Sequence, residues 1–251
     1  MKPFKIILAI ILLISPCQIS KASAEDHFRW RQYYQPINEH QARRHLQKAL
    51  NYVTKILGPA SFHVDHVYLY LSQPKNSHDR IKKGFQLTEA NDLAAGEFTI
   101  YLSHNPTENA CLGQLVHEVT HLMDSRIHDA YFEGLSTVMA EKYLKENGLD
   151  WSGWRDYFAR GHEPFYARTY FMMREIWDVV GDEGMRDFHT YTQASPEDPG
   201  QLRIDINRWI QKVPRAHQLR VRGIIAKYAP QIKLAMNQNQ HPTAFLMPDI
   251  L

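Results

Sequence analysis

The hydrophobic pattern of this chain changes at Asn105-Pro106, and the change limits the folds open to it. Before this point, the segments 67–71 and 98–102 alternate strongly apolar residues with tyrosine or threonine, which is the period of a β-strand. After it, apolar residues recur at the three- and four-residue spacing of helices as far as about Lys233. Strands followed by helices predict an α+β fold.

An amphipathic helix is predicted ahead of the strands. Apolar residues keep helical spacing from Ala42 to Leu57, and Gly58-Pro59 ends the pattern. The segment 72–96, between the two predicted strands, is polar and rich in turn residues. We therefore expect a surface loop there, with room for a short strand around Phe85.

Two helices are predicted directly after the change in pattern. Asn is a favoured N-cap and Pro a favoured first helical residue, so the first helix is expected from about Thr107 to Ser125. The second is expected to begin near Ala130 and to end at Asn147-Gly148, with the glycine as its C-terminal cap.

The C-terminal part of the chain is predicted to be a helical lobe over 149–238. The pattern is broken at Gly161, Gly181 and Pro214, each a residue that interrupts helices. The strands and the helix expected from about Thr107 to Ser125 would then lie in an N-terminal α/β lobe that extends to about residue 148, with a cleft between the lobes.

The N-terminus has the composition of a secretory signal peptide. Lys2 and Lys5 precede an apolar run, and the polar stretch after it ends in Ala22-Ser23-Ala24, which predicts cleavage after Ala24. The run is too short to span a bilayer, and no later segment has the roughly 20 apolar residues of a transmembrane helix. The mature domain, 25–251, is therefore expected in the periplasm or outside the cell.

Composition bears on partners and on stability. Cleavage of the signal peptide removes three lysines and no acidic residue, which leaves 26 of the 29 Lys and Arg residues against 27 Asp and Glu. A nearly neutral chain gives no electrostatic reason to expect a nucleic-acid partner. Cys111 is the one cysteine that remains, so an internal disulfide is excluded and packing must stabilise the fold.

The sequence His117-Glu118-Val119-Thr120-His121 lies inside the first of the two predicted helices. Residues four apart project from one face of a helix, so His117 and His121 can bind a single Zn²⁺ ion. Glu118 is placed beside them, where it can accept a proton from water that the metal activates. Two histidines on an otherwise apolar helix would be costly to bury without a partner, which favours a metal site. The pattern therefore predicts catalytic zinc.

A catalytic zinc ion needs a third protein ligand. Downstream lies the segment Phe132-Glu133-Gly134-Leu135-Ser136-Thr137-Val138-Met139-Ala140-Glu141. Together with the histidine pair it resembles the gluzincin peptidases, in which a second helix supplies a Glu ligand followed by Gly and a small, apolar run. The resemblance extends from Leu112 to Glu141 at most. It implies a zincin-like fold with His117, His121 and Glu133 as zinc ligands and Glu118 as general base, and Gly134 would let the two helices approach closely.

Two other residues compete for the role of third ligand. Only 11 residues separate His121 from Glu133, which is fewer than in most gluzincins. Asp129 has a placement that resembles the aspzincin peptidases, although their Gly-Thr before the Asp is missing. His128 is a further candidate, but a metzincin would have Gly at position 124 and His at 127, where this chain has Asp and Ile. Glu133 is the preferred ligand.

Two segments are candidates for contact with a substrate. An edge strand beside the cleft pairs with the extended substrate in such enzymes, and the strand 97–103 is the candidate, unless it is an ordinary half-buried strand. The Tyr-rich segment 166–174 resembles the helix that follows the ligand helix in several gluzincin-like families, and it is the candidate source of a residue that stabilises the transition state. Tyr166 is the first choice, followed by Tyr170 and His162, although aromatic residues at this spacing often belong to a core.

These observations predict an exported zinc metallopeptidase that hydrolyses peptide bonds in a peptide or protein substrate. Two alternatives stay open. The chain could be a zinc hydrolase of a non-protein amide, or a non-catalytic protein in which zinc only joins helices. The presence of Glu118 favours catalysis, because a structural site has no need of a base. The sequence leaves the oligomeric state undetermined.

Overall fold

The computed structural model describes residues 34–72, 86–103, 105–107, 112–196 and 198–239. They form a small sheet and a larger set of helices, which confirms the predicted α+β class. Among these residues, no helix combines the length and apolar character that crossing a membrane requires. The predicted signal peptide and Cys111 lie outside the described residues.

The main sheet has four strands in the order β1-β2-β4-β3. Its strands are β1 (Tyr34–Pro36), β2 (His66–Ser72), β3 (Leu87–Asp92) and β4 (Glu97–Leu102). The inner pair, β2 and β4, is parallel, with Val67 opposite Phe98, and both outer pairs are antiparallel. The two strands predicted from the alternating pattern are this inner pair.

Strand β3 corrects the prediction of a surface loop over 72–96. It begins just beyond Phe85 and pairs with β4 through the register Thr88 to Ile100. Its sequence, Leu-Thr-Glu-Ala-Asn-Asp, is mostly polar and so gives no strand periodicity. Pairing with a buried neighbour holds it in place, and this cannot be seen in the local sequence. Residues 73–85 of the predicted loop lie outside the described residues.

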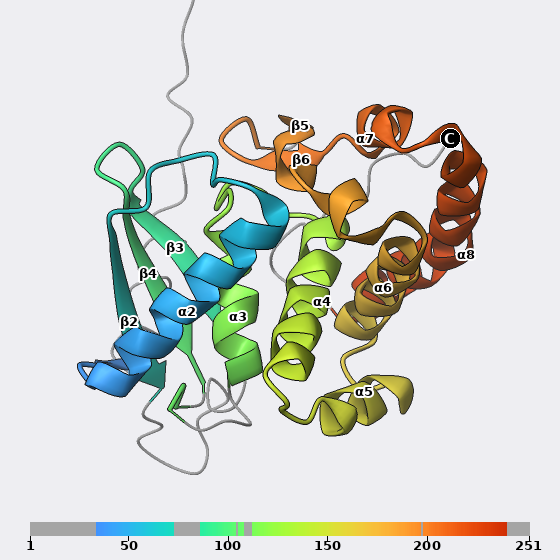
Figure 1. Cartoon of the computed structure of the whole chain (residues 1–251). Coiled ribbons are helices and arrows are strands. Elements are labelled where there is room, and N and C mark those ends of the chain that lie inside the picture. The colour runs from blue at the N-terminus through green and yellow to red at the C-terminus, as the bar shows by residue number, and fades with distance from the viewer. Residues whose placement is uncertain (1–33, 73–85, 104, 108–111, 197, 240–251) are drawn as a thin grey trace, which may run out of the picture.

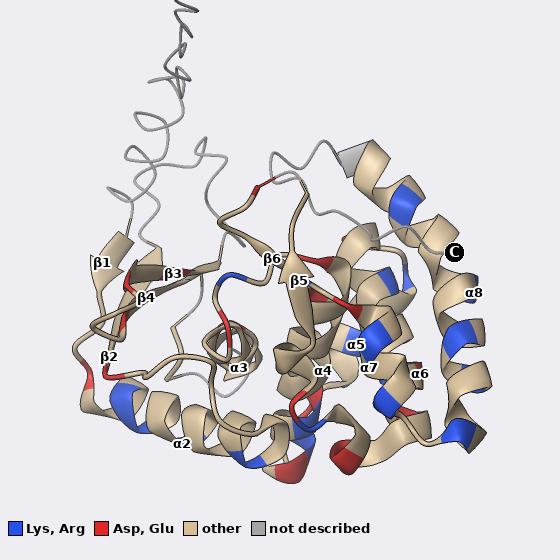
Figure 2. Cartoon of the chain, turned by 90° about the horizontal axis from the view of Figure 1, so that it is seen from above, with Lys and Arg blue, Asp and Glu red and all other residues tan. Residues whose placement is uncertain are grey.

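The helices cover one side of the sheet and extend away from it (Figure 1). They are α2 (His40–Leu57), α3 (Leu112–His121), α4 (Ala130–Glu146), α5 (Ser152–Ala159), α6 (Pro164–Met185), α7 (Ile206–Lys212) and α8 (Arg215–Asn239). Helices α2 and α3 lie on the same side of the sheet (Figure 2). Helix α4 packs between α3 and α6, and α6 packs in turn against α8.

Two predicted helices have the expected ends. Helix α2 stops at Gly58, whose φ of 88° is in the left-handed range that favours glycine, and the Gly58 N–H donates to the Thr54 carbonyl. Helix α4 starts after Asp129, whose carboxylate accepts a hydrogen bond from the Phe132 N–H at 2.8 Å, and Gly148 follows its C-terminus with a φ of 68°.

Other boundaries differ from the prediction. Asn105 closes a turn, because its side-chain oxygen accepts hydrogen bonds from the backbone and hydroxyl of Thr107. Residues 108–111, between this turn and the start of α3, lie outside the described residues. Helix α3 ends at His121, four residues before the predicted Ser125. The stretch predicted to be helical to Lys233 also contains a 3-10 turn, η2 (Phe188–Thr190), and the antiparallel hairpin of β5 (Thr192–Ala194) and β6 (Leu202–Ile204).

A large cluster of buried apolar side chains connects most of the described elements, and Tyr34 and Tyr101 form a second, small cluster. The large cluster includes Leu69 in β2, Val116 in α3, Leu135 in α4 and Met173 in α6, and it continues to Ile232 in α8. Buried residues on both sides of the α4–α5 connection therefore belong to one core. This shared core fixes α3 and α4 relative to each other.

Candidate metal centre

The structure brings His117, His121 and Glu133 together between α3 and α4. The Nε2 atoms of the two histidines lie 3.3 Å apart. His117 Nε2 is 3.2 Å from one carboxylate oxygen of Glu133, and His121 Nε2 is 3.7 Å from the other. All three ligating atoms lie within 4.8 Å of one another, so the group could hold a metal ion.

Two helices supply this group. The histidines are one turn apart near the C-terminus of α3, and Glu133 is in the first turn of α4. Their side chains are 8%, 12% and 9% exposed in the order His117, His121 and Glu133, so the group is largely shielded but not sealed from solvent. Two imidazole nitrogens and a carboxylate are the donor types that catalytic zinc sites use. The residues present could therefore hold a metal ion, and zinc is among the metals that bind such donors.

Thr137 connects the candidate ligands of the two helices and was not identified from the sequence. Its hydroxyl donates to the Glu133 carbonyl at 3.0 Å, and its oxygen lies 3.2 Å from His117 Nδ1. Because the hydroxyl proton is already donated, the oxygen accepts a hydrogen bond from the Nδ1–H group. In the neutral ring this tautomer leaves Nε2 available to bind a metal ion. Its position one turn after Glu133 was the signal in the sequence that could have pointed to it.

Glu118 lies next to the group in a buried position. Its residue is 2% exposed, and the Thr88 hydroxyl on β3 lies 2.8 Å from its Oε2 atom. Burial raises the pKa of Glu118 to about 7, against the opposing effects of His121 and of the Thr88 hydrogen bond. Thr88 was also missed, because it falls in the segment that the sequence predicts to be a loop.

The two carboxylates of the site have opposite electrostatic environments. Burial alone would raise the pKa of Glu133, but attraction to His121 and hydrogen bonds from both histidines outweigh it and hold that pKa well below its ordinary value. Glu133 is therefore suited to remain ionised as a ligand. Glu118 lacks such a dominant cationic partner and is suited to exchange a proton near neutral pH.

Neither alternative third ligand belongs to the group among the described residues. The Asp129 carboxylate instead accepts hydrogen bonds from the backbone N–H groups of Phe132 and Ile204, which ties the start of α4 to β6. His128 is half-buried, and burial lowers its pKa, with a smaller effect from His121 in the same direction. Asp129 thus serves as a helix cap and as an anchor for the hairpin.

Tyr166 is the one of the three proposed transition-state residues that the structure places at the group. Its ring centroid is 6.4 Å from that of His117, and the pKa of its hydroxyl is raised well above the ordinary value by burial and by Glu133 and Glu118. Tyr170 instead donates to Glu141 at 3.0 Å, and His162 stacks on Tyr157 at 4.6 Å between ring centroids. These two residues have structural partners of their own.

The strand β4 is not an edge strand, so the prediction that it pairs with a substrate is wrong. Strands β2 and β3 occupy its two sides, and β3 is the outer strand of the sheet in the described part of the chain. The expected role of Gly134 also needs correction. A Cβ atom at Gly134 would lie 2.3 Å from the Thr169 carbonyl oxygen, so this glycine permits the close approach of α6 rather than of α3.

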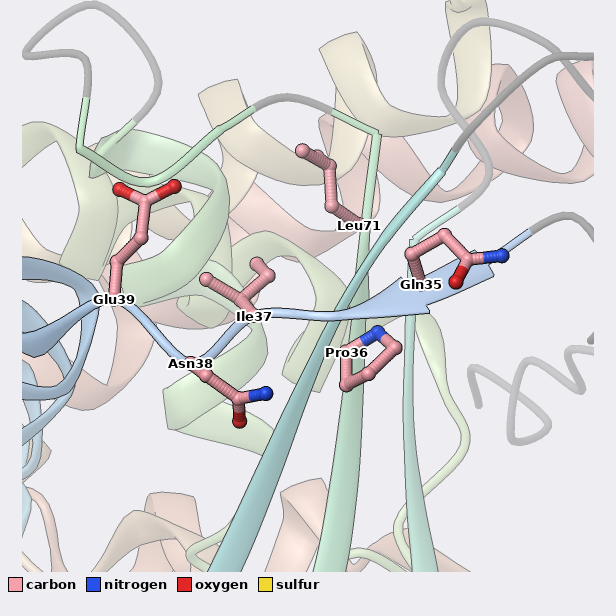
Figure 3. A pocket seen from close by; sticks show the side chains of 6 residues that line it. All are labelled: Gln35, Pro36, Ile37, Asn38, Glu39 and Leu71. Carbon is pink, nitrogen blue, oxygen red and sulfur yellow. The ribbon is translucent and has the colours of Figure 1, made fainter.

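A surface hollow lies at β1 and the segment that leads from it into α2 (Figure 3). It is lined by Gln35, Pro36, Ile37, Asn38, Glu39 and Leu71. None of these residues is a predicted site residue. The functional argument therefore stays with the His–Glu group.

Comparisons with known proteins add no assignment. No protein family model, curated protein or solved structure matches the chain.

Proposed function

We propose that this protein is an exported, zinc-dependent metallopeptidase with a zincin-like fold. The observation that carries the proposal is the convergence of His117, His121 and Glu133 beside the buried carboxylate of Glu118. A binding site alone would account for the first three residues. The fourth supplies a proton acceptor at the place where hydrolysis requires one.

His117, His121 and Glu133 would hold the zinc ion in this proposal. Zinc supplies Lewis-acid chemistry, which polarises a carbonyl group and makes water more acidic. Thr137 fixes the ring of His117, so that its Nε2 atom faces the ion without a proton. The largely buried setting strengthens each of these electrostatic interactions relative to water.

Glu118 moves the proton in the proposed reaction. It accepts a proton from water as the water oxygen forms a bond to the carbonyl carbon of the peptide. The carbon–nitrogen bond then breaks, and Glu118 returns the proton to the leaving amine, so that one water molecule yields one carboxylic acid and one amine. Tyr166, at the edge of the group, is placed to donate a hydrogen bond to the carbonyl oxygen as its negative charge develops.

The proposal is tested by metal content and hydrolysis measured on the same preparations of mature protein. Elemental analysis should find one zinc ion per chain in the wild type, and Glu133→Ala should lose it. Glu118→Gln should keep the zinc ion but lose hydrolysis of a mixed library of internally quenched peptides by about 100-fold or more. Asp129→Asn is the matched control on metal content, because Asp129 caps α4 outside the group.

Three outcomes would contradict the proposal in different ways. A wild type that takes up no zinc after reconstitution would remove the metal site. Zinc uptake with equal peptide hydrolysis by wild type and Glu118→Gln would remove the catalytic role. Zinc uptake with no hydrolysis of any peptide in the library would leave a metal-binding protein and overturn the assignment as a peptidase.

A further inference from the structure

The hydroxyl group of Thr88, on strand β3, donates a hydrogen bond to the candidate general base Glu118. Thr88 and Glu118 are 30 residues apart in the sequence, and both are buried. The Thr88 Oγ1 atom lies 2.8 Å from Glu118 Oε2 and 2.9 Å from the Glu118 carbonyl oxygen. The side chain and the backbone of one residue thus share one partner on the sheet.

The two acceptors differ in what they require. A buried carboxylate has lost its hydration and needs hydrogen-bond donors to remain ionised. The Glu118 carbonyl is in the last turn of α3, where carbonyl groups lack helical partners. In a continuing helix the Leu122 N–H would donate to it, but this N–H donates to the Val119 carbonyl instead. One hydroxyl proton can serve one of the two acceptors at a time.

We propose that Thr88 is a positioning residue, which holds Glu118 by its Oε2 atom so that Oε1 is the oxygen that takes the proton from water. This inference rests on the proposed function of Glu118. The same hydroxyl also lies within hydrogen-bond distance of the Glu118 carbonyl oxygen, so β3 contacts both the side chain and the backbone of this residue.

The sheet gives Thr88 a fixed position from which to act. Thr88 is opposite Ile100 in the ladder between β3 and β4, and Ile100 is fully buried. General-base catalysis depends on holding the base within a fraction of an ångström of its proton donor. A hydroxyl on a paired strand restrains the carboxylate better than a water molecule would, because its own position is set by the backbone ladder.

Three variants separate this role from a general effect on the sheet. Thr88→Val removes the hydroxyl while keeping the branched shape that suits a strand, and Thr88→Ser keeps the hydroxyl. Thr99→Val is the matched control, because Thr99 is a buried threonine on β4 whose hydroxyl bonds to Asn91. Each is compared with wild type and Glu118→Gln for zinc content, kcat and KM on the quenched peptide library.

Thr88→Val is expected to lower kcat by about 10- to 100-fold, with KM changed less than about twofold and one zinc ion retained. Thr88→Ser and Thr99→Val should stay within about threefold of wild type. Crystal structures of the metal-free proteins provide a readout independent of activity. They should show the Glu118 carboxylate turned away from its wild-type orientation in Thr88→Val and unchanged in Thr88→Ser.

The failures of the two proposals are distinguishable. If Thr88→Val matches wild type while Glu118→Gln is inactive, the positioning role is wrong and the proposed function stands. If Thr88→Val and Thr99→Val lose activity equally, or Thr88→Ser fails as badly as Thr88→Val, the hydroxyl has no specific role. If Glu118→Gln is as active as wild type, or wild type does not hydrolyse the library, the proposed function fails and this inference falls with it.

Discussion

Helix α4 contains two buried glutamates, Glu133 and Glu141, whose surroundings differ. Glu133 faces two histidines, and His117 Nε2 is nearest to its Oε2 atom while His121 Nε2 is nearest to its Oε1 atom. Glu141, two turns later, accepts hydrogen bonds from the side chains of Lys145 and Arg174 and from Tyr170, the bond from Arg174 being 2.6 Å long. Both carboxylates are buried, but only Glu141 has lysine and arginine as partners, whereas Glu133 has two histidines.

This difference in partners distinguishes the candidate metal site at Glu133 from the structural ion pairs of Glu141. Arginine and lysine side chains carry a positive charge at neutral pH, so Arg174 and Lys145 neutralise Glu141 there. Histidine, in contrast, is not permanently charged near neutral pH, and ligating atoms of His117, His121 and Glu133 lie close enough together to hold one ion. A buried carboxylate without a permanent cation favours binding one. Four predictions test this comparison, from the largest expected effect to the smallest.

Glu133→Ala should weaken zinc binding more than about 100-fold. Mutation of a residue that only supports a ligand lowers metal affinity by about 10- to 100-fold, and removal of the ligand itself should lower it further. Competition against a chromophoric chelator measures the affinity. The far-ultraviolet circular dichroism spectrum should remain that of the wild type. Unchanged zinc affinity in this variant would show that Glu133 is not a ligand.

Removal of metal should destabilise the wild type and leave Glu133→Ala unchanged. A ligand that is present at about 100 times its dissociation constant adds about 2.7 kcal/mol to the free energy of unfolding. Urea unfolding with zinc and with excess EDTA should therefore differ by about this amount for the wild type. Equal unfolding curves under the two conditions would indicate that no zinc is bound to the folded protein.

Glu141→Ala should lower the free energy of unfolding of the metal-free protein by about 2 kcal/mol, because it leaves Arg174 and Lys145 without their partner. The effect is below that of a fully buried pair, since the side chains of these cations are 35% and 49% exposed and can be rehydrated. Zinc affinity should change less than about twofold. Glu146→Ala, at the exposed end of the same helix, is the control and should cost about 0.5 kcal/mol.

Thr137→Val should weaken zinc binding about 10-fold, because the ring of His117 loses the acceptor that fixes its tautomer. Thr137→Ser should restore wild-type affinity in the same chelator competition. A loss of affinity in both variants would point to packing between α3 and α4 rather than to the hydrogen bond. A wild-type affinity in Thr137→Val would show that His117 needs no partner at Nδ1.

The sequence pattern located α2, α4 and the inner strands β2 and β4 well, and it located the C-terminal end of α3 and strand β3 poorly. Strong apolar periodicity and end signals such as Gly58 and Gly148 act within a few residues, so they can be read locally. The Asn105-Pro106 pair has the composition of a helix start but forms a turn. The polar strand β3 exists because β4 pairs with it.

The sequence by itself determined which residues could bind zinc, because the four-residue spacing of His117 and His121 puts them on one face of any helix. Only the tertiary structure decided that Glu133 joins them while Asp129 caps α4. It alone also brought Thr88 to Glu118 and placed β4 inside the sheet. Helix geometry is set by neighbours within one turn, whereas contacts between elements depend on how separate surfaces pack, which no local pattern records.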